Sequence, residues 1–167
     1  MDITLSEIIL RLGVATVAAG AVGLNRDLHG KSIGVRTLGL VGLSTAAAVL
    51  LSDGGLVRAD ISDATSRVIQ GILTGIGFLG AGVILRPRHG RQIRGLTSAA
   101  CVWFTACIGI VCGAGAWHIV VVAGVLAALL LTLGRPVEHL FHRLLGADET
   151  DAKSSAQSDN GPHQPGK

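Results

Sequence analysis

One stretch of the chain, Gly95–Gly134, contains no Asp, Glu, Lys or Arg. Shorter stretches without these residues are Leu12–Leu24, Thr37–Ser52 and Val68–Leu85. A helix needs roughly 20 apolar residues to cross the hydrocarbon core of a bilayer, and Gly95–Gly134 is long enough for two such helices. Only 15% of the residues are charged, against about 25% in an ordinary soluble domain. These runs predict a polytopic membrane protein.

The predicted fold is an all-α bundle of five transmembrane helices over residues 1–134. The longest run is divided at Cys112–Trp117, where the sequence CGAGAW is rich in glycine. A short amphipathic interfacial helix is expected at 135–146, followed at 147–167 by a disordered cytoplasmic tail, because that segment has no apolar residue beyond alanine. The five predicted spans are roughly Leu5–Leu24, Thr37–Ser52, Arg67–Leu85, Leu96–Cys112 and Trp117–Gly134.

The charges between the spans alternate in sign. The segments after the first and third spans are basic, whereas the segment after the second span is mostly acidic. Because basic loops stay in the cytoplasm, the N-terminus is predicted outside and the C-terminus inside. The residues that decide this are Arg26, Lys31, Arg36, Arg86, Arg88, Arg91 and Arg94 on the inner side, and Asp53, Asp60 and Asp63 on the outer side.

The third span contains GIGFLG at Gly75–Gly80, a formal match to the G-x-G-x-x-G pattern of dinucleotide-binding proteins. That pattern binds pyrophosphate between a strand and a helix, whereas here it lies inside an uncharged run, so no nucleotide is expected. Small residues on two sides of a helix instead allow close approach of neighbouring helices in lipid, which predicts a helix at the centre of the bundle. The proposed packing glycines are Gly71, Gly75, Gly77, Gly80 and Gly82, and similar spacings recur at Ala15, Ala19 and Gly23 and at Gly42 and Ala46.

Polar residues gather at the predicted inner ends of spans one, two and four. Two interpretations stay open: these residues set the topology and cap helices, or they line a polar pocket at the cytoplasmic mouth of the bundle. The cytoplasmic polar cluster consists of Asn25, Arg26, Asp27, Arg36, Thr37, Thr97 and Ser98.

A second polar group, the outer polar cluster, consists of Arg11, Asp63, Arg67 and Gln70. Arg11 follows Glu7 by one helical turn, so it forms either a local ion pair near the interface or a buried charge that faces the bundle. Arg67 and Gln70 open the third span beside acidic residues, which indicates either salt-bridged anchoring or a weak cation site.

No catalytic, metal or cofactor site is predicted, and the chain is not expected to be an enzyme. Cys101, Cys107 and Cys112 all lie on the fourth span, where helix geometry keeps them from sharing a metal or forming a disulfide. The net charge of +3 comes from basic residues placed between apolar spans, which argues against nucleic-acid binding. The expected partners are the lipid bilayer and either another integral membrane protein or a second copy of the chain.

Three segments make the sequence similar to a known family: GAVGLNRDLHGKSIGVRT (Gly20–Thr37), RVIQGILTGIGFLGAGVIL (Arg67–Leu85) and RGLTSAACVW (Arg94–Trp103). They resemble the MgtC/SapB family of small bacterial inner-membrane proteins, over roughly residues 6–135. The resemblance implies a multi-pass inner-membrane protein with a role linked to growth in low magnesium and survival inside hosts. The family pattern usually has Glu where this chain has Asn25, and the likeness is to the short form without a soluble C-terminal domain.

Two functions are therefore compared. The first is a non-enzymatic regulatory or accessory membrane protein that acts through protein–protein contacts in the membrane. The second is a small transporter or channel for magnesium or another ion. A magnesium path generally needs carboxylates, and the sequence has none between Arg11 and Asn25 or inside the later spans, which favours the first hypothesis.

Overall fold

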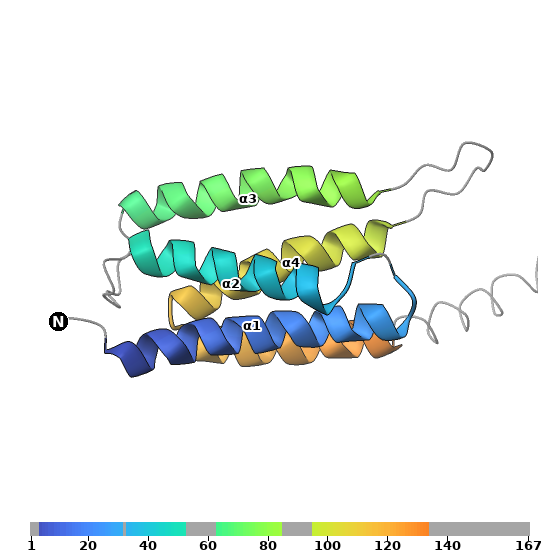
Figure 1. Cartoon of the computed structure of the whole chain (residues 1–167), viewed down its shortest axis with the longest axis horizontal. Helices are drawn as coiled ribbons and strands as arrows, with labels where there is room; N and C mark the ends of the chain where they lie inside the picture. Colours follow the sequence, from blue (N-terminus) through green and yellow to red (C-terminus); the bar gives the residue numbers. More distant parts are fainter. Residues whose placement is uncertain (1–3, 32, 53–62, 85–94, 134–167) are drawn as a thin grey trace, which may run out of the picture. The chain divides into compact units, whose positions relative to one another are not determined.

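The computed structural model describes residues 4–31, 33–52, 63–84 and 95–133. These residues form helices joined by turns, with no strand among them, so the predicted all-α class is confirmed for this part of the chain (Figure 1). The segments predicted as an interfacial helix and a tail, 135–146 and 147–167, lie outside the described residues. The helices are α1 (Leu5–Leu28), α2 (Val35–Ser52), α3 (Asp63–Val83) and α4 (Leu96–Gly113), followed by an apolar helix at Trp117–Leu133.

Four of these helices, α1 to α4, are long and apolar enough to cross a membrane. The helix Trp117–Leu133 is shorter. By its internal contacts the chain divides into two units, Met1–Leu126 and Ala127–Lys167. The described part of the second unit, residues 127–133, is helical.

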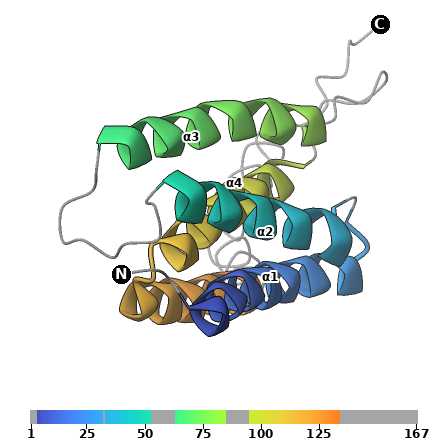
Figure 2. The same cartoon turned by 60° about the vertical axis from the view of Figure 1, so that its left-hand side comes forward.

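Successive helices of the first unit run in opposite directions (Figure 1). Helices α1, α2 and α4 pack against one another, whereas α3 packs against α4 and, less extensively, α2 (Figure 2). A core cluster draws on α1, α2, α4 and the following helix, and consists of Ala15, Ala46, Ile108, Cys112 and Val120.

Small residues bring the backbones of α1, α2 and α4 close together. A Cβ atom on Gly42 would lie 2.5 Å from the Cβ of Ala19 and 3.0 Å from the carbonyl oxygen of Ala15. Both of these alanines are fully buried. Association of helices in lipid depends on such close contact. The predicted packing positions Ala15, Ala19 and Gly42 are therefore confirmed at the contact between α1 and α2, whereas Ala46 faces α4, where a Cβ on Gly113 would lie 2.7 Å from its carbonyl oxygen.

The expectation that the glycine-rich helix lies at the centre is wrong for the single chain, because α3 lies at the edge. Its buried residues are Thr65, Ile76 and Val83. A Cβ atom on Gly80 would be 3.9 Å from the Cβ of Ala99, and one on the other four proposed packing glycines would meet nothing within 4 Å. Small residues show that a helix can be approached closely, but they do not specify which neighbour approaches it.

Candidate functional site

Two residues of the cytoplasmic polar cluster meet at the end of the bundle where α1 ends and α4 begins, which we call the Arg26 end. Helix α1 extends one turn beyond the predicted span and carries Arg26 in its last turn. The Arg26 side chain is only 5% exposed, and its Nη2 donates a hydrogen bond of 2.7 Å to Oγ of Ser98, on the first turn of α4. Within the described ranges, the Nε–H of Arg26 has no hydrogen-bond partner. The contact thus joins α1 to α4 and leaves one buried donor unsatisfied.

Asp27 caps the start of α2. Its carboxylate accepts a hydrogen bond of 2.9 Å from the backbone N–H of Val35, the first residue of that helix. A carboxylate at this position satisfies a free N–H group and complements the positive end of the helix dipole. The connection is tight, because a side chain on Gly34 would overlap the Asp27 carboxylate and a Cβ on Gly23 would lie 2.7 Å from the Val35 nitrogen. Of the two interpretations of this cluster, helix capping describes Asp27.

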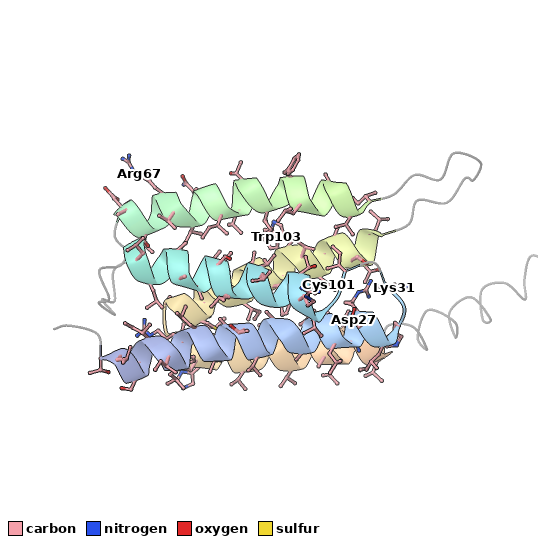
Figure 3. The ribbon with its side chains drawn as sticks, in the orientation of Figure 1. Asp27, Lys31, Arg67, Cys101 and Trp103 are labelled. Atoms are coloured by element: carbon pink, nitrogen blue, oxygen red, sulfur yellow. The ribbon has the colours of Figure 1, made fainter. Side chains whose placement is uncertain are left out.

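The remaining members of the cytoplasmic polar cluster are less buried than Arg26 and Ser98. Asn25 is half-buried, and its carbonyl oxygen lies 2.6 Å from Nδ1 of His29. The other three members, Arg36, Thr37 and Thr97, are exposed. Figure 3 shows Asp27, Lys31 and Cys101 at this same end of the bundle.

Arg11 lies at the opposite end, where α4 finishes. Its side chain is 3% exposed; Nε donates to Oε1 of Glu7 at 2.8 Å, and Nη1 donates to the carbonyl oxygen of Gly113 at 2.8 Å. The last carbonyl groups of a helix lack intrahelical partners and carry its negative dipole end. Both interpretations of Arg11 therefore describe it: the residue forms the local ion pair, and it also faces the bundle interior.

A glycine makes room for this arginine. Gly115 follows α4 with a φ of +75°, and a Cβ there would lie 2.9 Å from Cζ of Arg11. The glycine-rich break at Cys112–Trp117 was predicted from the sequence, whereas the pairing of Arg11 with the carbonyl group of Gly113 was not. Two features of the sequence could have indicated this partner. A charged residue inside a span needs a hydrogen-bond acceptor, and the predicted topology places the end of span four on the same side of the membrane as Arg11.

The outer polar cluster does not form one group. Asp63, Arg67 and Gln70 lie exposed on α3, and Figure 3 shows Arg67 pointing away from the other helices. Because α3 does not pack against α1, these residues are separate from Arg11. Span order places residues at the same end of a bundle, but lateral helix packing decides whether they touch.

Among the described residues, no group of three His, Cys, Asp or Glu side chains is arranged to hold a metal ion. Cys101, Cys107 and Cys112 are free cysteines on α4, and the first and last of them are buried. They contribute small side chains to the packing of this helix.

The described residues form an all-helical protein with four helices that are long and apolar enough to cross a membrane. Two buried arginines of α1 bind the two ends of α4. The chain belongs to the MgtC family, whose sequence pattern matches residues 12–140. The family predicted from the three sequence segments is thereby confirmed.

Individual relatives agree with this membership. The "Putative magnesium transporter YhiD" of Escherichia coli strain K12 is 36% identical over 143 residues, which cover 83% of this chain and 62% of that protein. "Protein SrpB" of Synechococcus elongatus is 41% identical over 118 residues, 65% of this chain and 64% of that protein. "Protein MgtC" of Brucella abortus is 38% identical over 126 residues, 75% of this chain and 50% of that protein.

The matches thus span one half to two thirds of the length of these relatives. No solved structure matches the chain.

Proposed function

We propose that this protein is a non-enzymatic, multi-pass protein of the bacterial inner membrane, with a regulatory or accessory role linked to magnesium limitation and to stress or host survival. It acts through contacts with another integral membrane protein or with a second copy of itself. Family membership supports the membrane location, and the printed names of the relatives YhiD and MgtC support the connection to magnesium.

The observation that carries the protein-contact proposal is the open glycine surface of α3. Gly71, Gly75, Gly77 and Gly82 have nothing within 4 Å of a built Cβ atom, although glycine reduces the stability of an isolated helix. In lipid, such small residues are useful where another helix approaches. On α2 and α4, Gly42, Gly109 and Gly113 lie against neighbouring helices of the same chain, whereas four glycines of α3 stay open, so α3 carries the largest group of open glycines for a partner.

The alternative function is transport of magnesium or another ion, as the name of the E. coli relative suggests for that protein. Magnesium is bound through one or two carboxylates while it keeps several waters. In the described parts of α1 to α4 the acidic residues are Glu7, Asp27 and Asp63, all near helix ends. The Glu7 and Asp27 carboxylates bond to Arg11 and to the start of α2, which favours the accessory role.

A flux assay and a growth assay separate the two functions. Liposomes containing the purified protein should take up no more Mg²⁺ than empty liposomes. Gly75→Leu should leave the protein folded but abolish its support of growth in low magnesium, because leucine blocks close approach to α3. Phe78→Leu is the matched control, since Phe78 is already bulky and 83% exposed on the same helix. Protein-dependent Mg²⁺ uptake would favour transport, and normal growth with Gly75→Leu would contradict the proposed contact.

The proposed orientation is N-outside and C-inside, supported by the basic segments after the first and third spans. Topology reporters fused after Lys31, Asp60, His89 and Gly146 should report inside, outside, inside and inside, respectively. An outside signal at His89 would overturn the orientation, because four arginines in that segment carry most of the argument.

A further inference from the structure

Arg26 is a buried positive charge that has no counter-charge among the residues described by the structure. Its side chain is 95% shielded from solvent, since 5% is exposed. Among the residues that the structure describes, the ion pair is that of Arg11 with Glu7, and Arg26 bonds to the uncharged hydroxyl of Ser98. A buried charge is costly unless it is paired. A buried donor without a partner, such as the Nε–H of Arg26, calls for an explanation such as a bound water or ion.

The surroundings of Arg26 add further positive charge to this end of the bundle. Helix α4 begins beside it, and the N-cap residue Gly95 provides no side-chain hydrogen bond to the first turn. The free N–H groups of a first turn carry the positive end of the helix dipole. At the other end of α4, Arg11 meets the negative end, as electrostatics favours. At its start, α4 presents a positive end to a second arginine.

The acid at this end of the described structure does not provide the missing negative charge. Asp27 is exposed, and its carboxylate accepts the N–H of Val35 at the start of α2. The sequence of the segment that precedes α4, residues 85–94, contains four arginines and no acid. The exposed residues Lys31 and Arg36 add positive charge at the same end.

We propose that Arg26, Ser98 and the first turn of α4 bind a phosphate group. Helix N-termini bind phosphate through their free N–H groups, and guanidinium groups pair with phosphate more strongly than with neutral acceptors. The start of a membrane-crossing helix lies at the depth of the lipid headgroups. The phosphate therefore comes from an anionic lipid headgroup or from free phosphate. This site is separate from the α3 surface and does not depend on the proposed accessory role.

The thermal unfolding midpoint of the purified full chain tests this site and identifies the source. In detergent, inorganic phosphate should raise the midpoint by roughly 2–4 °C above chloride at equal ionic strength. In lipid discs, replacing phosphatidylcholine with phosphatidylglycerol should raise it similarly if the lipid headgroup is the ligand. A rise with inorganic phosphate alone assigns the site to free phosphate, and a rise with phosphatidylglycerol alone assigns it to lipid. No rise in either arm would overturn the proposal.

Three variants decide whether Arg26 carries the effect. Ser98→Asp places a carboxylate beside the guanidinium and in the first turn of α4, so its midpoint without additives should exceed that of the wild type and should no longer respond to phosphate or phosphatidylglycerol. Arg26→Gln should also lose the response. Arg36→Gln removes an exposed charge at the same end and should keep it. A site at Arg26 would be contradicted if the midpoint of Ser98→Asp still rose fully with phosphate or phosphatidylglycerol, or if Arg36→Gln lost this rise as completely as Arg26→Gln. If Arg26→Gln does not fold, the Ser98→Asp result alone decides.

Discussion

Gly109→Leu should strongly destabilise the protein. A Cβ at this position would overlap Oγ1 of Thr45 and lie 2.5 Å from the carbonyl oxygen of Gly42. Because the second of these atoms belongs to the backbone of α2, no side-chain rotation can make room, and α2 and α4 must move apart. Overpacking of a well-packed core typically costs 1–3 kcal/mol; we expect about 3 kcal/mol here, measured as the free energy of unfolding in detergent.

Gly75→Leu is the matched control, since it also replaces glycine by leucine in a helix long and apolar enough to cross a membrane, here α3. A Cβ on Gly75 would meet nothing within 4 Å, so the unfolding free energy of the single chain should change by less than about 0.5 kcal/mol. The measurement is made on the monomeric protein. If Gly75→Leu lowered the unfolding free energy as much as Gly109→Leu, the position of α3 at the edge of the bundle would be contradicted.

Arg11→Leu should be the second large effect. The substitution removes the hydrogen bonds to Glu7 and to the carbonyl oxygen of Gly113, and it leaves that carbonyl group without its buried donor. Breaking a buried ion pair costs about 3–5 kcal/mol, but the Glu7 side chain is 35% exposed and remains partly hydrated. We therefore expect a loss of about 2 kcal/mol in the unfolding free energy.

Arg67→Leu provides the comparison, because Arg67 is an exposed arginine at the end of the bundle where α1 begins (Figure 3). Its removal should change stability by no more than about 0.5 kcal/mol. Adding Glu7→Gln to Arg11→Leu should recover part of the lost free energy, since the unpaired carboxylate is then removed. If Arg11→Leu and Arg67→Leu proved equally mild, the Arg11–Gly113 hydrogen bond would contribute little to stability.

Charge placement made much of this fold predictable. Runs without charged residues located α1 to α4 within a few residues, because the hydrocarbon core excludes charges. The small residues Ala15, Ala19 and Gly42 were also recognisable as packing positions, since their spacing places those of one helix on the same face. Helix ends were less well defined: α1 continues to Leu28 and α3 already begins at Asp63, because polar residues at a membrane interface can still be helical.

Lateral arrangement was not predictable from the same patterns. The sequence placed Arg26 and Ser98 at one end of the bundle, yet many pairings within that cluster were equally compatible with it. It also indicated that α3 can be closely approached but not that α4 is its main neighbour. Both questions depend on which helix faces meet, and that is decided by contacts between residues far apart in the chain.

The two buried arginines also restrict how α1 and α4 can move. Arg11 and Arg26 are separated by as many residues along α1 as their partners Gly113 and Ser98 are along α4, a span of roughly 22 Å at the helical rise. In an antiparallel pair, this equal spacing holds the register at two points. Sliding by one turn, about 5.4 Å, would break both hydrogen bonds at once. A piston-like shift of α1 against α4 is therefore strongly disfavoured, and this pair of helices acts as a fixed frame for the contacts that α2 makes with both of them.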